Sequence, residues 1–521
     1  MIVSITIKEK DEKLLAKTNT CAVHGVDGQL VEVEVDISPG VPRFNIVGLP
    51  DSSVQESRER VRAAIRNSGA EFPLRRITVS LAPADIKKTG PSYDLPIAIG
   101  ILVCSGQIPD AVSKSLFLGE LALDGKLRTT HGMLPMLREG KERGYDTAFV
   151  PRVNSKEASL VPGIDIRPVE TLRQVVEYLR DEADLPSVQS GGIPDLDGIP
   201  AVRTGYDFRD VRGQEQAKRA LEIAAAGNHN IVLMGAPGCG KTLLARCLPS
   251  ILPPMTAEEA LEVTTIYSVT GLLPSGSPLI THRPFRAPHY TISNAGLIGG
   301  GSIPRPGEVT LSHRGVLFLD ELPEFGNATL ETLRQPLEDR TVTISRARTS
   351  STFPASFMLV GAMNPCPCGY HGDSQQPCTC GEPAVARYQR RISGPLIDRI
   401  DMFVDVPRVE YEKLITPPVE EGSASARERI MVAVQLQHER FQGSTVMSNA
   451  LMGPVEVWDS CKMSDDAKSL LQSAMKHLRM SARSCHRVLK VARTIADLEQ
   501  TPLIENHHLA EALMYRHKTS A

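Results

Sequence analysis

The sequence predicts an α/β protein built from three parts, and three observations support this prediction. The chain has 521 residues, which is too long for a single hydrophobic core. In its middle, apolar runs typical of strands alternate with helical patterns, as in a parallel sheet. Its N-terminal part mixes strands and helices in an α+β pattern, whereas its C-terminal part carries helical patterns only.

The N-terminal part covers residues 1–184. Within it, SSVQESRERVRAAIRNSG at residues 52–69 predicts a helix, because serines stand at its start, apolar residues follow at helical spacing and a glycine ends it. Residues 185–205 are dense in Gly, Pro, Ser and Asp and lack periodicity, so we expect a linker. The parallel-sheet module then covers residues 206–408, and the helical part covers residues 409–521.

Composition narrows the function classes. The chain is 41% hydrophobic and 23% charged, as is usual for globular proteins, and its net charge is −3. Any nucleic-acid binding must therefore use local basic patches. No signal peptide is visible, and the longest apolar run, residues 95–104, is far shorter than the roughly 20 residues of a membrane span. We expect a cytoplasmic protein without membrane contact.

A phosphate-binding loop is the strongest motif. The apolar run at residues 231–234 leads into GAPGCGKT and then into an amphipathic helix, which is the strand–loop–helix setting that G-x-x-x-x-G-K-[ST] requires. Backbone N–H groups of the glycine-rich loop and the helix N-terminus attract phosphates. We expect ATP with Mg²⁺ as ligands. The residues predicted to hold them are Gly235, Ala236, Pro237, Gly238, Cys239, Gly240, Lys241 and Thr242.

Two acids follow the apolar run of GVLFLDELPEF. Asp320 is placed to hold the Mg²⁺ shell together with the Thr242 hydroxyl, and Glu321 is placed to polarise a water for attack on the γ-phosphate. We therefore expect the chain to hydrolyse ATP.

Three further polar residues extend the site. Asn364 ends the apolar run of FMLVGAMNPCP, where it would lie beside the γ-phosphate. Arg399, just before a final strand, could reach the ATP of a neighbouring subunit. Arg483 stands near the start of a C-terminal helix and could act in cis, although Arg487 lies one turn further along. Together these residues predict a ring ATPase.

Several stretches carry a family resemblance: FNIVGLPDSSVQESRERVRAAI, NPCPCGYHGD, SGPLIDRID, VARTIADLE and LAEALMYR. Over essentially its whole length the chain resembles the ComM/YifB family of magnesium-chelatase-like AAA+ ATPases. The resemblance implies an N-terminal domain of the ribosomal-S5/Lon-protease-like fold, a central AAA+ module and a helical lid. It also implies a homo-hexameric motor on single-stranded or branched DNA, which drives branch migration in recombination or natural transformation.

The same resemblance assigns roles to the site residues. It implies that Lys241 and Thr242 form the Walker A pair and that Asp320 and Glu321 form the Walker B pair. It further implies that Asn364 is sensor 1, Arg399 the arginine finger and Arg483 sensor 2. Insertions around YTISNAGLIGGG and in TVTISRARTSSTF are expected to enter the ring pore.

Ser92 raises the question of a protease site, because GPSYD resembles the GPSAG around the nucleophile of Lon proteases. The Lon base is a lysine about forty residues downstream. Leu134 and Pro135 occupy that place here, and neither can accept a proton. We therefore expect no protease activity and expect Ser92 to cap a helix that begins at Tyr93 or Asp94.

Four cysteines cluster in CPCGYHGDSQQPCTC: Cys366, Cys368, Cys378 and Cys380. Two thiol pairs around a glycine-rich loop could form a tetrahedral, structural zinc site. The C-x-C spacing is tighter than the usual C-x₂-C, so reduced thiols without metal stay an open alternative.

DNA contacts are expected from Arg346 and Arg348, which alternate along the ISRAR arm of a predicted hairpin and would share one face. Such a pair suits sequence-independent phosphate contacts. Two other functions remain open from the sequence: a magnesium-chelatase-type ATPase subunit and a protein-remodelling ATPase.

Overall fold

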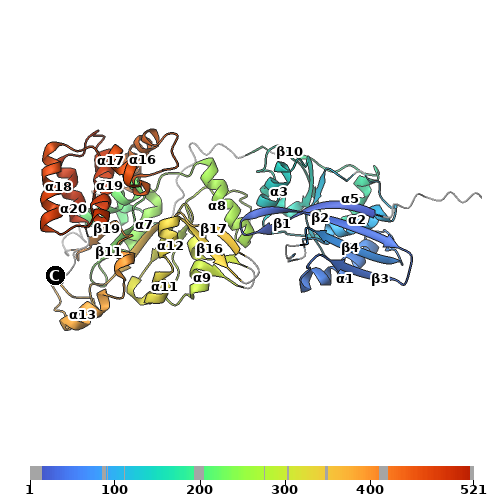
Figure 1. The fold of residues 1–521 in the computed structure, drawn as a ribbon, viewed down its shortest axis with the longest axis horizontal. Coiled ribbons are helices and arrows are strands. Elements are labelled where there is room, and N and C mark those ends of the chain that lie inside the picture. Colours follow the sequence, from blue (N-terminus) through green and yellow to red (C-terminus); the bar gives the residue numbers. More distant parts are fainter. Residues whose placement is uncertain are drawn as a thin grey trace, which may run out of the picture. The chain divides into compact units, whose positions relative to one another are not determined.

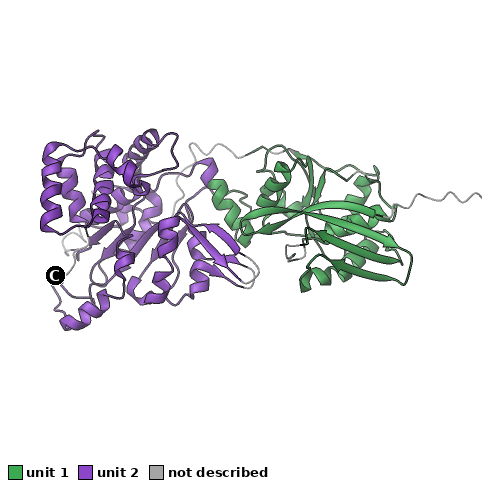
Figure 2. Cartoon of the chain, viewed as in Figure 1, with its two compact units in different colours: residues 1–195, 260–280 green, residues 196–259, 281–521 purple. Residues whose placement is uncertain are grey.

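The structure is a computed structural model of the 521-residue chain. It describes residues 15–84, 88, 90, 92–110, 112–189, 191–192, 205–274, 276–301, 304–346, 350–409 and 421–516. By its internal contacts the chain divides into two compact units (Figure 2). Unit 1 comprises residues 1–195 and 260–280, and unit 2 comprises residues 196–259 and 281–521. The domain boundaries expected from the sequence stay predictions. The contact-based division differs from them in one segment, because it places residues 260–280 in unit 1.

Unit 1 is organised by an eight-stranded mixed sheet with the order β10-β9-β8-β5-β1-β2-β4-β3 (Figure 1). Its strands are β1 (Leu15–His24), β2 (Asp27–Ser38), β3 (Arg43–Val47), β4 (Arg76–Ala82), β5 (Ser115–Phe117), β8 (Thr147–Pro151), β9 (Asp165–Val169) and β10 (Val188–Gln189). The pairs β1–β2, β2–β4 and β9–β10 are antiparallel, and the other pairs are parallel. The short strands β6 (Glu120–Leu121) and β7 (Leu127–Arg128) pair with each other.

The helices of unit 1 are α1 (Ser52–Asn67), α2 (Asp94–Cys104), α3 (Met133–Glu142), α4 (Ser155–Ala158), α5 (Leu172–Leu179) and, mostly, α8 (Ala257–Thr270). The helix predicted from residue 52 is confirmed, and Asp51 caps it by accepting from the Val54 N–H at 2.8 Å. The apolar run at residues 95–104 forms α2, whose residues are all buried and which packs on β1 and β2. Among the described residues, no helix combines the length and apolar character that a membrane crossing requires.

Unit 2 contains the predicted parallel sheet, with the order β12-β15-β18-β11-β19. Its strands are β11 (Ile231–Met234), β12 (Phe285–Arg286), β15 (Val316–Leu319), β18 (Met358–Met363) and β19 (Met402–Asp405). Every pairing in it is parallel, so the carboxyl ends of the strands meet along one edge, where polar loop residues can gather. Two small antiparallel pairs lie outside this sheet: β13 (Gly299–Gly300) with β14 (Arg305–Pro306), and β16 (Thr341–Ser345) with β17 (Ser350–Pro354).

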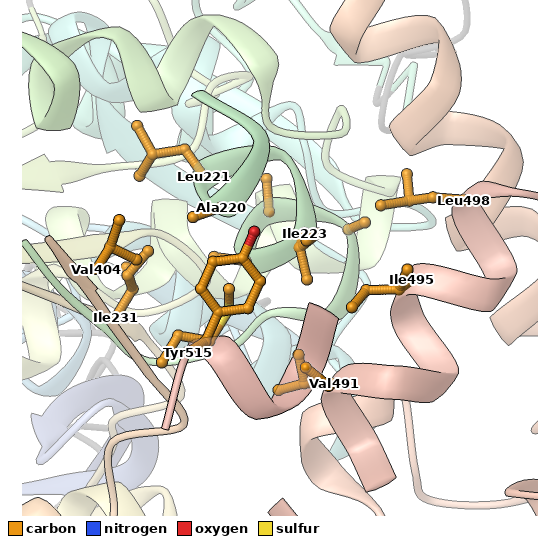
Figure 3. Packing of buried hydrophobic residues seen from close by; sticks show 14 of the residues in the cluster. Ala220, Leu221, Ile223, Ile231, Val404, Val491, Ile495, Leu498 and Tyr515 are labelled. Carbon is orange, nitrogen blue, oxygen red and sulfur yellow. The ribbon is translucent and has the colours of Figure 1, made fainter. Parts of the chain in front are cut away.

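The helices of unit 2 pack on this sheet and on one another. They are α6 (Glu215–Gly227), α7 (Lys241–Ile251), α9 (Asn294–Ile298), α10 (Glu308–Leu311), α11 (Asn327–Glu331), α12 (Arg334–Asp339), α13 (Glu382–Gln389), α14 (Gly394–Ile397), α16 (Ser423–Arg440), α17 (Pro454–Ser460), α18 (Asp465–His477), α19 (Ala482–Leu498) and α20 (Asn506–Met514). The C-terminal region is helical, as predicted. Figure 3 shows the Tyr515 ring among buried side chains of α6, β11, β19 and α19, so the C-terminal helices share one core with the sheet.

Candidate nucleotide-binding site

The loop between β11 and α7 has the geometry of an anion-binding turn. Gly238 and Gly240 take positive φ values of 79° and 95°, a region that side-chain-bearing residues rarely adopt. A Cβ added at either glycine would meet no atom within 4 Å, so open space lies beside this backbone. Gly240 is also the N-cap of α7. Backbone N–H groups at a helix N-terminus beside open space can receive a phosphate chain.

Lys241 points back into its own loop. Its Nζ donates hydrogen bonds to the carbonyls of Gly235 at 2.8 Å and Ala236 at 2.9 Å, and to Asn364 Oδ1 at 3.1 Å. The residue is only 9% exposed. An ammonium held over the loop by neutral acceptors can exchange them for phosphate oxygens, which are stronger partners. The structure thus brings together Lys241 and Asn364, which are 123 residues apart in the sequence.

Thr242 and the acids after β15 form a second cluster of oxygens. Thr242 Oγ1 donates to Asp320 Oδ2 at 2.8 Å, and Asp320 Oδ1 accepts from the Glu321 N–H at 3.0 Å. A hydroxyl and a carboxylate at this spacing suit Mg²⁺, which prefers oxygen ligands together with substrate phosphates. Glu321 is exposed and has a positive φ of 53°, a conformation that non-glycine residues adopt rarely.

Neighbouring segments hold the phosphate loop in place. The Gly235 N–H donates to the Met363 carbonyl at 3.2 Å, which joins the loop to the end of β18. Gln214 Nε2 donates to the Cys239 carbonyl at 3.2 Å. Sequence reasoning missed Gln214, because only its long-range contact identifies it; its own positive φ of 63° marks the start of α6.

Arg399 and Arg483 meet at one carboxylate that sequence reasoning also missed, Glu338. A terminal nitrogen of Arg399 donates to Glu338, and Arg483 Nη2 lies 3.7 Å from Glu338 Oε1. Arg399 also donates to the Pro395 carbonyl at 2.7 Å. The Arg399 side chain is 12% exposed and that of Arg483 is 49% exposed. The two predicted arginines therefore lie together at one place on unit 2.

Arg487 has a different environment from Arg483. Its Nη1 donates to the carbonyls of Ile397 at 2.9 Å and Ile400 at 2.8 Å, and its Nη2 lies 3.2 Å from Asp398 Oδ1. These bonds fasten α19 to the segment that carries Arg399. Arg487 is thus committed to structure, whereas Arg483 keeps a half-exposed side chain.

The four cysteine thiols of residues 366–380 converge. The Sγ–Sγ separations are 3.3 Å for Cys366–Cys368, 3.7 Å for Cys366–Cys378 and 3.6 Å for Cys368–Cys378, and the four sulfurs lie within 4.8 Å of one another. Four thiolates around zinc at about 2.3 Å would be separated by roughly 3.8 Å. Backbone N–H groups of Tyr370 and then Thr379 lower the pKa of Cys368 to about 5, whereas, against one backbone hydrogen bond each, burial and the neighbouring thiols raise the pKa of Cys378 and Cys380, so the thiols share protons when no metal is bound. The residues therefore fit a tetrahedral metal ion.

A second cluster of metal-ligand types, Glu499, His507 and His508, has another explanation. His508 Nδ1 accepts from the Glu505 N–H at 2.9 Å, so its Nε2 carries the proton and donates to Glu499 at 3.0 Å. A protonated nitrogen cannot ligate a metal. This cluster is a hydrogen-bonded cap of α20.

The prediction that Ser92 caps a helix is wrong. The helix α2 begins at Asp94, its N-cap is Tyr93, and no side chain caps it. Asp94 instead forms a buried ion pair with Arg60, at 2.7 Å between Oδ2 and Nε, and accepts from the Leu121 N–H at 3.3 Å. The helix therefore begins where the sequence predicted, but the buried Tyr93, which is 1% exposed, holds the N-cap position and Ser92 precedes it.

The predicted hairpin is present as β16 and β17, but Arg346 does not lie on its strand. Strand β16 ends at Ser345, so Arg346 follows the strand rather than lying on it, and the argument from strand alternation does not apply to it. Arg346 is exposed, and its Nε donates to the Gly301 carbonyl at 3.3 Å, which joins the hairpin to the β13 segment. Arg348 lies outside the described residues.

Known families and relatives match most of the chain. The family described as "Magnesium chelatase, subunit ChlI" matches residues 207–414, "Subunit ChlI of Mg-chelatase" matches residues 33–154, and "Magnesium chelatase, subunit ChlI C-terminal" matches residues 420–516. Competence protein ComM of Haemophilus influenzae is 42% identical over 508 residues, covering 96% of this chain and 97% of the relative. YifB of Escherichia coli is 40% identical over 506 residues, covering 96% and 97%. Lon protease 2 of Bacillus subtilis is 31% identical over 185 residues, which is 30% of this chain.

These matches extend over both units, and the phosphate loop, the acid pair and Asn364 lie within the first matched family segment of unit 2. A nucleotide site of this geometry on a parallel sheet, followed by C-terminal helices, is what an AAA+ ATPase requires. The chain therefore belongs to the ComM/YifB family of magnesium-chelatase-like AAA+ ATPases.

Proposed function

We propose that this protein is an ATP-hydrolysing ring motor that acts on DNA, as a branch-migration or helicase-type factor in recombination or natural transformation. One observation carries the hydrolytic part: Lys241 contacts Asn364 and Thr242 contacts Asp320, so residues from three strand ends meet at one loop. The likeness to a competence protein supports the DNA part.

ATP binds with its phosphates along the N–H groups of the loop from Gly235 to Gly240. Lys241 then exchanges its backbone acceptors for oxygens of the β- and γ-phosphates. Asn364 contacts the γ-phosphate. Thr242 and Asp320 would hold Mg²⁺, which supplies charge neutralisation at the phosphate oxygens when bound. Glu321 orients and polarises the attacking water, because its carboxylate is exposed beside Asp320.

We propose a homo-hexamer in which Arg399 reaches the ATP of an adjacent subunit. Glu338 holds both Arg399 and Arg483 in the single chain, so either arginine must leave this carboxylate in order to contact a phosphate. A triphosphate carries more charge than one carboxylate and can compete for both side chains. Arg483 is the better candidate for sensor 2, because Arg487 already donates to four partners.

The N-terminal unit belongs to the same proposal as a ribosomal-S5/Lon-like domain without protease activity. Leu134, at the place of the Lon base, is buried in α3 and cannot accept a proton. The four thiolates of residues 366–380 would hold a structural zinc ion, since all four positions of a tetrahedron are filled by protein. The cytoplasmic location predicted from the sequence is part of this proposal.

The test measures the ATPase rate of purified protein alone and with single-stranded, duplex and branched DNA. A DNA motor predicts stimulation, with branched DNA also being remodelled. Stimulation by a porphyrin-metallating partner or by unfolded polypeptide, with no response to any DNA, would instead support the chelatase or protein-remodelling alternative.

A variant that lacks both Arg346 and Arg348 tests the proposed DNA contacts of the hairpin. Replacing both with Ala should weaken binding to every DNA sequence and lower its salt dependence, because phosphate contacts are lost. Basal ATP hydrolysis should persist. Arg387→Ala, an exposed arginine on α13, is the control for loss of positive charge. A double variant that binds and unwinds branched DNA like the wild type would remove the hairpin from the DNA site.

A further inference from the structure

The cysteine-bearing loop, residues 366–380, is joined directly to the nucleotide site. Asn364, which accepts from Lys241 Nζ at 3.1 Å, stands two residues before Cys366. The residue before it, Met363, accepts from the Gly235 N–H at 3.2 Å. Cys366 is fully buried. The first thiol therefore follows immediately after the residues that contact the phosphate loop.

A second contact comes from within the loop. Gly369 faces Pro237 of the phosphate loop so closely that an added Cβ would lie 2.5 Å from its Cδ and 2.7 Å from its Cγ. The same Cβ would lie 3.8 Å from Asn364 Cγ. The Gly369 N–H donates to the Cys366 carbonyl at 3.0 Å, which closes a turn that contains the first two thiols. This turn thus packs against Pro237 and Asn364 together.

The middle of the cysteine-bearing loop contacts the segment that follows β19. Asp373 forms an ion pair with Arg408 at 2.8 Å, and the Arg408 guanidinium lies 5.4 Å from the centre of the Tyr370 ring. The residue before Arg408, Pro407, accepts from Gln214, which also donates to the Cys239 carbonyl of the phosphate loop. The loop is therefore tied to both ends of the phosphate loop.

The loop has little core of its own to hold this arrangement. Between the thiol pairs it reads GYHGDSQQP, and residues 374–377 are all exposed. A glycine-rich, exposed loop loses conformational entropy on ordering and gains little from burial. The convergence of four thiols is the feature that can offset this loss, since a bound metal ion contributes folding free energy directly.

We propose that a zinc ion held by Cys366, Cys368, Cys378 and Cys380 clamps this loop against Pro237 and Asn364, so that the affinity of the phosphate loop for ATP depends on the metal. The inference rests on the proposed ATP and zinc sites and adds a coupling between them. The metal does not contact the phosphates. It orders the cysteine-bearing loop, and Gly369 of that loop positions Pro237 of the phosphate loop. Because the coupling is measured by nucleotide binding, its failure can be told apart from failure of the DNA-motor proposal.

Two glycines of the loop provide a matched test. Gly369 and Gly372 both have positive φ values, 87° and 81°, so alanine strains the backbone similarly at each. A Cβ at Gly372 would meet nothing within 4 Å, whereas one at Gly369 would collide with Pro237. We expect G369A to keep one zinc per chain but to bind a fluorescent ATP analogue about tenfold more weakly, with G372A binding like the wild type. Equal affinities of the two variants for the ATP analogue, whether both normal or both weakened, would refute the proposed role of the contact between Gly369 and Pro237.

Metal release tests the same coupling in the unaltered chain. Zinc per chain is measured by elemental analysis, then released with a mercurial and detected with a chromophoric chelator while Mg²⁺ is kept in excess. We expect a ratio near one, and a fall in affinity for the ATP analogue of about tenfold on release, restored by thiol and zinc. The same release from a C239S variant is the control, because Cys239 is a free thiol of the phosphate loop and a mercurial bound there would itself weaken ATP binding. A protein without zinc that binds the analogue normally, or binding unchanged on release, would refute the proposal.

Discussion

Arg483 and Arg487 lie one turn apart on α19. Replacing each with alanine should show that Arg483 senses phosphate and that Arg487 stabilises the fold. Arg487 donates to the carbonyls of Ile397 and Ile400 and pairs with Asp398, with a side chain only 16% exposed. Arg483 has an ion pair of 3.7 Å and a side chain 49% exposed. Removal of Arg487 takes a donor from two part-buried carbonyls, of which the Ile397 carbonyl keeps the Ile400 N–H at 3.1 Å, whereas removal of Arg483 exposes little.

The magnitudes follow from these contacts. Hydrogen bonds to a charged group contribute about 1.5–3 kcal/mol each, so after partial hydration of the carbonyls R487A should lose about 2–4 kcal/mol of stability. For a unit of this size that loss lowers the melting temperature by roughly 3–6 °C. R483A should lose no more than about 1 kcal/mol, as is usual for an exposed ion pair.

Calorimetry and ATPase assays on both variants check this. R483A should melt near the wild type, bind ATP and hydrolyse it slowly, while R487A should melt earlier, and R487K should recover part of the stability. Equal melting shifts for R483A and R487A would contradict the structural role of Arg487. A stable R487K that binds ATP without hydrolysing it would assign the sensor role to Arg487.

The remaining predictions concern the nucleotide site and the N-terminal unit. K241A should lose ATP binding, whereas E321Q should retain binding and lose hydrolysis, as measured with an ATP analogue and a phosphate-release assay; normal turnover by E321Q would show that another group activates the water. R399A should bind ATP without hydrolysing it, and rings mixed from R399A and K241A subunits should regain some hydrolysis; an active monomer would contradict a shared site. S92A should leave the ATPase rate unchanged, and acylation of Ser92 by a serine-directed probe would contradict the absence of a protease site.

What the sequence determined by itself is mostly local. The phosphate loop and the helix at residues 52–67 are predictable from short stretches of sequence, because glycine φ values, N-caps and helical spacing act over a few positions. The parallel sheet of unit 2 was predictable for the same reason, since alternating strands and helices leave few other arrangements. The start of α2 at Asp94 was predicted too, but its cap shows the limit of local reasoning, because Tyr93 and not Ser92 is the N-cap residue.

Only the tertiary structure decided which distant side chains meet. The motifs predict that Thr242 and Asp320 lie together, but not that Glu338 gathers Arg399 and Arg483 or that Gln214 donates to the Cys239 carbonyl. Spacing in the chain does not encode such contacts, because they depend on how strands are ordered in the sheet and which helices cover it. The packing of Gly369 on Pro237 arises in the same way, because β18 pairs with β11 and brings the cysteine loop that follows it to the phosphate loop.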